Sequence, residues 1–496
     1  MAKTTKVIVF ATMMVLGAAL VFAQQSNADQ ATFGEIGTDV DNFLHSVNWK
    51  SVELNGLFAF TRIGANIQEG RTEVGVAFKP GSLYLGFYYN GDIMGYGEKS
   101  TSTDITLTNP SKTDDTKIIK QRNHQKANPH ATYGALVGLA NGMGIKLKFV
   151  DDLRVRPITG GDDWRGTLTP SLEIGGSFGP ISRIGLSFPI VYNRTETVTT
   201  TNATGTPSAV GIYTTTALKD DGTPVTGIDE LLKSKGNYVG PDLYLKMGFG
   251  TLTLENNLRM RFYGVPGYNK DGEVAGLAGN GLVTASYNFA EGKYSSMASV
   301  WDSRFGIEDT IKPSINVSGD AGKLTYSVTV GLPITFGGNG HALNYKYDAP
   351  DGGDSVEFKD YYKMSDFQLR IGPSVAAGVK YQLMDILAVQ CGLSADIFTF
   401  GLDTTTGTKT EEKFEKAPTA YSAFRSVSDD VTTAETSWIY PKVTVAAGTT
   451  LTLAQKIGLD LLFFSEVIPS ATGMIYKSAS EAAGSSGISL VLTAKF

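Results

Sequence analysis

Basic side chains recur at alternate positions in several segments of the chain, for example Lys146 with Lys148 and Arg259 with Arg261. In an extended strand, residues two apart point to the same face of a sheet. A face that gathers several ammonium and guanidinium groups attracts anions, and rings of such groups select anions where they line a water-filled passage. This spacing indicates electrostatic recognition of small charged solutes rather than covalent chemistry.

Covalent chemistry has few candidates. The chain contains four histidines, His45, His124, His130 and His341. A hydrolase that pairs a serine or an aspartate with histidine needs one of them oriented by hydrogen bonds, and His341, near Asp348 and Asp351, is the candidate. The stretch 348–354 offers oxygen ligands for calcium but lacks the fixed spacing of a calcium loop. We therefore predict that the protein is not an enzyme and uses no cofactor and no metal.

The composition excludes several classes of protein. The single cysteine, Cys391, rules out an intramolecular disulfide framework and a multi-cysteine metal site. The net charge of −6 argues against a globally basic nucleic-acid-binding protein. A hydrophobic fraction of 42% and a mean hydropathy of −0.06 exclude a disordered chain and a helical-bundle membrane protein, respectively.

The first residues have the layout of a secretory signal peptide. Lys3 and Lys6 form a basic start, an uncharged run follows over 7–21, and Ala23 closes a small-residue cleavage site. The run is shorter than the roughly 20 residues of a membrane-spanning helix. The segment therefore predicts export across an inner membrane.

Period-2 alternation of apolar and polar residues recurs through the rest of the chain and predicts strands. At the C-terminus, Ile488, Leu490, Leu492, Ala494 and Phe496 fall on one face. A chain that ends on an aromatic residue after such a strand resembles the bacterial outer-membrane β-barrel proteins, which include the porins. The resemblance implies an up-and-down barrel in the outer membrane, contact with outer-membrane lipid, and recognition of the C-terminal end by the barrel-assembly machinery.

The connections between strands favour this barrel over a soluble sandwich. Short turns, such as those at 80–81, 179–182 and 320–322, alternate with long segments rich in Thr, Ser, Gly, Asp and Lys. Short periplasmic turns and long extracellular loops are typical of outer-membrane barrels. We also predict that regularly spaced prolines begin strands, because a proline at the first position removes no ladder bond. These prolines are Pro170, Pro241, Pro313, Pro373 and Pro441.

The proline spacing predicts an all-β, antiparallel barrel of about 16 strands and treats 264–310 as a loop in which 281–301 forms a hairpin folded inward. The alternative takes 283–289 and 294–301 as a further membrane hairpin and gives 18 strands. The predicted division is a signal peptide at 1–23, a short periplasmic segment at 24–53 and the barrel at 54–496.

On such a barrel, nearly all charges within the strands fall on the face that points to the lumen, and basic residues outnumber acidic ones there. One explanation is that charges simply avoid lipid. The other is a basic lumen that favours anionic solutes. The predicted channel-lining residues are Lys146, Lys148, Arg154, Arg156, Lys246, Arg259, Arg261, Arg370, Lys380 and Lys442.

A barrel of this size is wide enough to enclose an aqueous channel. The leading hypothesis is a porin-like channel for passive diffusion of small polar, including anionic, solutes. Two alternatives stay open: a surface adhesin or antigen that acts through its long loops, and a fatty-acid-type transporter of hydrophobic solutes. The expected partners are outer-membrane lipid, the assembly machinery and small polar solutes, with no nucleic acid, and a homo-trimer is one assembly that such a barrel can form.

Overall fold

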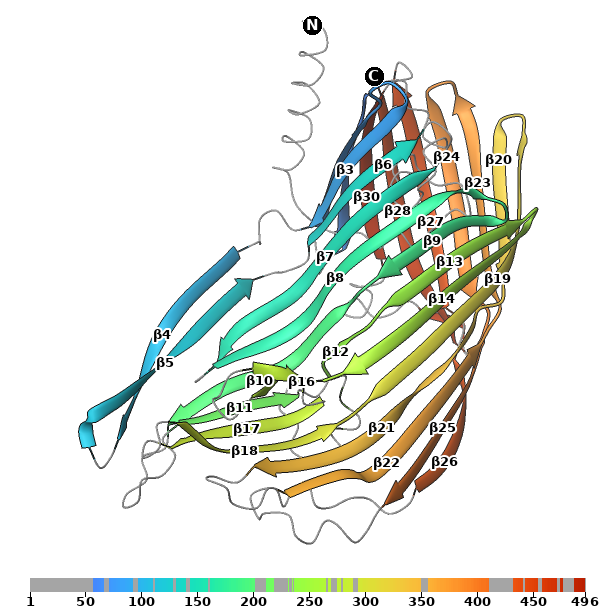
Figure 1. The fold of residues 1–496 in the computed structure, drawn as a ribbon. Coiled ribbons are helices and arrows are strands. Elements are labelled where there is room, and N and C mark those ends of the chain that lie inside the picture. Colours follow the sequence, from blue (N-terminus) through green and yellow to red (C-terminus); the bar gives the residue numbers. More distant parts are fainter. Residues whose placement is uncertain are drawn as a thin grey trace, which may run out of the picture.

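The computed structural model shows one antiparallel sheet that closes into a barrel (Figure 1). Its first strand, β1 (Leu57–Asn66), pairs with its last, β30 (Ser486–Lys495), over most of their length. The predicted signal peptide, the segment 24–53 and Phe496 lie outside the described residues. The structure describes residues 57–66, 71–91, 97–109, 112–127, 131–139, 143–158, 161–200, 211–217, 231, 234, 236–264, 266–268, 274–277, 280–288, 293–348, 356–409, 431–439, 442–453, 457–470, 473–475 and 486–495.

The wall of the barrel has 16 strand positions, which confirms the preferred count. Besides β1 and β30, the positions formed by one strand are β2 (Arg71–Phe78), β3 (Leu83–Gly91), β6 (Ala131–Leu139), β7 (Gly144–Ile158), β8 (Gly161–Phe178), β14 (Leu252–Tyr263), β19 (Phe305–Ala321) and β28 (Ile457–Ser470). The others are formed by two strands in line: β9 (Ile181–Ser187) with β10 (Ile190–Thr200), β12 (Tyr238–Val239) with β13 (Asp242–Phe249), β20 (Leu324–Gly331) with β21 (Ile334–Asp348), β22 (Val356–Ile371) with β23 (Ser374–Met384), β24 (Leu387–Asp396) with β25 (Thr399–Lys409), and β26 (Val431–Ile439) with β27 (Lys442–Leu453).

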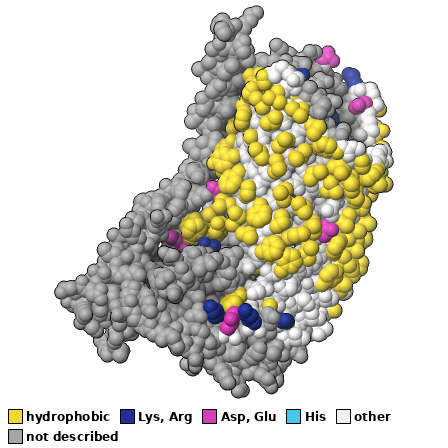
Figure 2. All heavy atoms as spheres, in the orientation of Figure 1, with side chains coloured by type: hydrophobic (Ala, Val, Ile, Leu, Met, Phe, Trp, Pro, Cys, Tyr) yellow, Lys and Arg dark blue, Asp and Glu magenta, His cyan; other side chains and the backbone are white. Residues whose placement is uncertain are grey.

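Apolar side chains cover the outside of this wall. In β7, Ile145 and Leu147 are 46% and 56% exposed, whereas Lys146 between them is 6% exposed. Figure 2 shows the apolar field, with a small acidic spot inside it. On this outer face the Asn256 amide donates to Asp309 Oδ1 at 2.6 Å. Because a closed barrel satisfies its backbone groups internally and its apolar face can meet lipid, the chain is a transmembrane barrel of the bacterial outer-membrane type.

Tight turns join the strands at one end of the barrel, which we call the short-turn end. Four of these turns place a glycine in the left-handed conformation, where other residues are strained. They are Gly81, Gly179, Gly250 and Gly322, with φ of 69°, 66°, 68° and 66°. These turns follow β2, β8, β13 and β19, so the antiparallel order places them all at the same end, as predicted. The longer connections lie at the opposite, long-loop end.

Two of the prolines lie within strands rather than at strand starts, which corrects the prediction for them, whereas Pro241 and Pro373 immediately precede β13 and β23. Pro170 and Pro313 are within β8 and β19, and the wall continues on both sides of Pro241 and Pro373, while Pro441 lies outside the described residues. Because a proline has no N–H to donate, its strand bonds its neighbour through the carbonyl.

Two runs of such contacts cross neighbouring strands, and we call them the proline runs. In the first, the carbonyls of Pro170, Pro189 and Pro241 accept the N–H groups of Phe188, Gly240 and Met260 at 2.9, 3.3 and 3.0 Å. In the second, the carbonyls of Pro313, Pro333 and Pro373 accept those of Leu332, Gly372 and Ile397 at 2.9, 3.3 and 2.9 Å.

The wall also extends beyond the predicted strands at the long-loop end. There β11 (Gly211–Ala217) pairs with β10, β17 (Asn280–Asn288) pairs with β11, and β18 (Lys293–Asp302) pairs with β17 and β21. The hairpin predicted at 281–301 therefore exists, but it prolongs the wall instead of folding inward. The physical reason is that β10 continues beyond its two-residue pairing with β12, and β21 continues beyond its pairing with β19, so their free edges take new partners.

The remaining strands form three small pairings. They are β4 (Gly97–Asn109) with β5 (Lys112–Ala127), β15 (Pro266–Tyr268) with β16 (Val274–Leu277), and β29 (Gly473–Ile475), which pairs with β28. No helix among the described residues is long and apolar enough to cross a membrane.

Candidate functional site: the inner face of the barrel

The residues predicted to line a channel are spread over six strands of the wall. Lys146, Lys148, Arg154 and Arg156 lie on β7, Lys246 on β13, Arg259 and Arg261 on β14, Arg370 on β22, Lys380 on β23, and Lys442, whose side chain is outside the description, on β27. Within their strands they alternate with apolar residues, several of which are exposed on the outer face. Their channel-lining role stays a prediction, but the structure shows which neighbours they meet.

Three of the arginines bind carboxylates on neighbouring strands. Arg261 pairs with Asp242 across β14 and β13. Arg259 Nη1 lies 2.9 Å from Glu308 Oε1 on β19, and Arg370 Nη2 lies 2.7 Å from Asp403 Oδ2 on β25. We call this set of six residues the arginine–carboxylate ladder. A guanidinium forms strong, directional hydrogen bonds with carboxylate oxygens, so each pair is close to neutral.

A glycine lets the ladder continue across β21. Glu308 and Gln368 are both in register with Gly337, which lies between them. Because Gly337 has no side chain, Gln368 Nε2 reaches Glu308 Oε2 at 3.2 Å. A Cβ atom at position 337 would lie 2.3 Å from the carbonyl oxygen of Ile307, so the backbones approach too closely for any other residue.

Other predicted basic residues are also paired. Lys246 Nζ lies 3.1 Å from Glu255 Oε1, and Arg156 Nη2 lies 2.9 Å from Asp163 Oδ2. The Lys146 ammonium is 5.6 Å from the centre of the Tyr88 ring, a distance at which a cation is attracted by the ring face. The inner face is therefore much closer to neutral than the basic residues alone indicate.

The acidic partners are not among the predicted residues. Glu308 falls in the segment 264–310, which is predicted to be a loop. A signal was present, because Glu308, Thr310 and Lys312 alternate with Ile307 and Ile311. Asp309 interrupts the apolar positions of that alternation, so the pattern alone does not predict the full length of β19.

His341 lies in a buried cluster near the long-loop end. Its Nδ1 is 2.7 Å from Asp302 Oδ2, and its Nε2 is 2.9 Å from Asp366 Oδ1. The side chain of the predicted partner Asp348 and the whole of Asp351 lie outside the described residues. Since a carboxylate occupies each ring nitrogen, neither nitrogen is free to act as a base toward a substrate hydroxyl.

The same cluster ties a segment of chain to the wall. Arg304 Nε lies 2.9 Å from Asp302 Oδ2, and its two terminal nitrogens donate to the carbonyl oxygens of Ser234 and Leu231, each at 3.0 Å. The side chains of Asp302 and Arg304 are 0% and 5% exposed. These contacts give the cluster a structural role. Within the described part of the chain, no group of three metal-ligating side chains is placed to hold a metal ion, and most of the stretch 348–354 lies outside that part.

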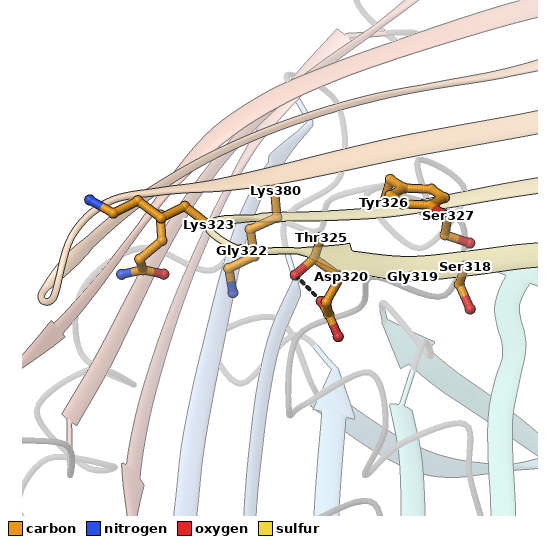
Figure 3. Close-up of a pocket in the computed structure, with 10 residues that line it drawn as sticks. Ser318, Gly319, Asp320, Gly322, Lys323, Thr325, Tyr326, Ser327 and Lys380 are labelled. Atoms are coloured by element: carbon orange, nitrogen blue, oxygen red, sulfur yellow. Dashed lines mark hydrogen bonds between the residues drawn. The ribbon is translucent and has the colours of Figure 1, made fainter.

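A polar cavity of about 750 Å³ lies at the short-turn end, between the β19–β20 hairpin and β23. Figure 3 shows Lys380, Asp320 and Ser318 on the same side of the hairpin. Asp320 Oδ1 accepts a hydrogen bond from the Thr325 hydroxyl at 2.6 Å. Among the described residues, Lys380 has no carboxylate within ion-pair distance, which distinguishes it from Lys246 and the ladder arginines.

No protein-family model matches the sequence, and no curated protein matches it. Among solved structures, a monoaromatic hydrocarbon channel, CymD, is 8% identical and the match covers 93% of each chain, with a TM-score of 0.26. OmpT, an outer membrane protein of Vibrio cholerae, is 7% identical over 88% of this chain and 96% of its own, with a TM-score of 0.23. A bacterial polysaccharide outer membrane secretin is 8% identical over 89% and 97%, with a TM-score of 0.31. At such values these similarities assign no activity.

Proposed function

We propose that the protein is an outer-membrane channel through which small polar solutes diffuse passively. One observation carries this proposal. The wall of 16 strand positions is closed and apolar on the outside, and its inner face carries ion pairs and hydroxyl groups. Barrels of 16 to 18 strands are wide enough to leave an aqueous channel.

The ladder defines how such a channel treats its solutes. Paired charges present both hydrogen-bond donors and acceptors along the wall, so a polar solute can exchange its water contacts for protein contacts of either kind. Because each arginine has a carboxylate beside it, the ladder adds little net potential. We therefore expect weak ion selectivity at the ladder and assign any preference for anions to lysines that have no carboxylate partner.

This inner face argues against the hydrophobic-solute alternative. A fatty-acid-type transporter needs an apolar passage, whereas Glu308, Arg370 and Asp403 would leave such a solute against charged groups. Burying a polar group without a hydrogen-bond partner costs free energy, so an apolar solute that displaced water from these groups would bind poorly. The adhesin alternative concerns segments that lie largely outside the described residues.

The experiment is single-channel recording of the purified, refolded protein in a planar bilayer with a gradient of potassium chloride. We expect steady openings and a reversal potential that is small and favours chloride. Heat-modifiable migration on electrophoresis establishes that the barrel is folded. A folded barrel that gives no conductance would overturn the proposal.

A further inference from the structure

Lys380 differs from every ladder arginine in its surroundings. It lies on β23, in register with Thr325 of β20 and with Gln390 of β24. None of these neighbours is acidic, and the closest carboxylate group in the cavity, that of Asp320, already accepts a hydrogen bond from Thr325. The lining therefore carries two ammonium groups, those of Lys380 and Lys323, against the single carboxylate of Asp320, and its net charge is positive.

A second donor beside Lys380 also lacks an acceptor. Gln390 is 7% exposed, and its Nε2 has no hydrogen-bond partner. A buried donor without an acceptor is costly, so this amide gains free energy from any acceptor that reaches it. Gln382, which lines the cavity, uses its own Nε2 to donate to the carbonyl oxygen of Met384 at 2.6 Å.

Gln390 lies beside the cavity rather than in its lining, and the lining itself supplies further groups. Lys323 lies in the turn at the rim and contributes a further positive charge. Ser318 is exposed, and Figure 3 shows it on the side of the hairpin to which Lys380 points. A ligand that fits must bring negative charge and several acceptor oxygens, and it must be small enough for about 750 Å³.

We propose that Lys380 and Gln390 form a transient binding site for the oxyanion group of a small solute, a carboxylate or a phosphate, at the short-turn end of the lumen. The proposal rests on the proposed channel function and names a solute class for it. An ammonium group recognises such an anion as a point charge, without the fixed geometry that a guanidinium imposes. Binding of this kind is weak enough to release the solute, which passage through a channel requires.

The location gives the site a direction. Short turns face the periplasm in barrels of this type, so a solute that enters from the long-loop end passes the neutral ladder first and meets Lys380 last. The site then raises the local concentration of anions at the periplasmic end of the channel, since clefts with an excess of one sign of charge concentrate counter-ions.

The test measures inhibition of chloride current by inorganic phosphate, added separately to each side of a bilayer that contains the refolded protein. We expect phosphate to inhibit more strongly from the short-turn side. Lys380→Gln should weaken this inhibition by about tenfold, the effect of removing one charge-assisted hydrogen bond. Gln390→Leu should weaken it less, and Lys380→Arg should retain most of it because the charge remains.

Lys359→Gln is the matched control. It removes one positive charge from a side chain that is 69% exposed and outside the cavity, and it should leave inhibition unchanged. Equal inhibition of the Lys380→Gln and unchanged proteins would overturn the proposal, as would equal inhibition from both sides. If Lys380→Gln does not fold, the Gln390→Leu and Lys380→Arg proteins still decide the question. Absence of any conductance would instead contradict the channel function itself.

Discussion

Two regions of the inner face contain the same kinds of charged residue and differ in what stands beside them. Along β13, β14, β19, β22 and β25, each ladder arginine meets a carboxylate on a neighbouring strand. At the short-turn end, Lys380 meets Thr325 and Gln390 instead. The comparison teaches that the charge of a lumen is set by cross-strand neighbours and not by the number of basic residues.

The largest effect should come from adding a side chain at Gly337, the position on β21 that lies between Glu308 and Gln368. Gly337→Val places a Cβ atom 2.3 Å from the Ile307 carbonyl oxygen, so we expect the wall not to close and the heat-modifiable form to be lost on electrophoresis. Gly340→Ala on the same strand is the control, because nothing lies within 4 Å of its Cβ position. A Gly337→Val protein that folds as well as Gly340→Ala would contradict this reading.

The next effect separates buried from half-exposed arginines. Arg304→Met leaves Asp302, which is fully buried, without its guanidinium, and removing one partner of a buried pair costs about 3–5 kcal/mol. We expect a clear fall in the denaturant midpoint of unfolding, followed by tryptophan fluorescence. Arg259→Met is the comparison, since the Arg259 side chain is 45% exposed and should cost far less. If the denaturant midpoint falls equally in the two variants, the buried cluster around His341 does not stabilise the protein more than a half-exposed ion pair does.

A smaller effect should follow when a ladder arginine loses its carboxylate and so resembles Lys380. Glu308→Gln leaves Arg259 without its carboxylate. A unit charge at about 7 Å in water changes the energy of a passing ion by ~0.6 kcal/mol, with opposite sign for anion and cation. We therefore expect chloride permeability relative to potassium to rise by up to about sevenfold, as read from the reversal potential, and by less in concentrated salt. An unchanged reversal potential would mean that this part of the wall does not face the ion path.

The smallest effect concerns the pairing energy itself. A double-mutant cycle with Arg259→Gln and Glu308→Gln should give a coupling of about 0.5 kcal/mol in unfolding experiments, because half-exposed ion pairs contribute little in water. High salt should reduce this coupling further. A coupling of several kcal/mol, insensitive to salt, would indicate that water is largely excluded from the ladder.

Much of the fold could be predicted from the sequence because lipid imposes a period-2 pattern. Ile145, Leu147 and Phe149 alternate with lysines wherever one face meets acyl chains and the other meets water, and tight turns are marked by glycine. The strand count follows from these signals. Beyond the membrane both faces of a strand are hydrated, so β11, β17 and β18 carry no such pattern and their place in the wall could not be foreseen.

The site was less predictable, because its chemistry depends on pairs that are distant in sequence. Glu308 is 49 residues from Arg259, and Asp403 is 33 residues from Arg370. Alternation places each side chain on a face, but only the register between strands decides which residues stand opposite each other. Alternation predicts the basic residues as a set on one face, whereas their pairing with carboxylates depends on the register.

The proline runs have a consequence for how the barrel moves. Along each run the ladder is thinner, because a proline contributes a carbonyl but no N–H. The two runs together form a seam between the part of the wall near the short turns and the part that carries the long loops. Because the runs cross the wall only from β8 to β25, we expect a load on the long loops to bend this side of the barrel more than the side that contains β28, β30 and β1.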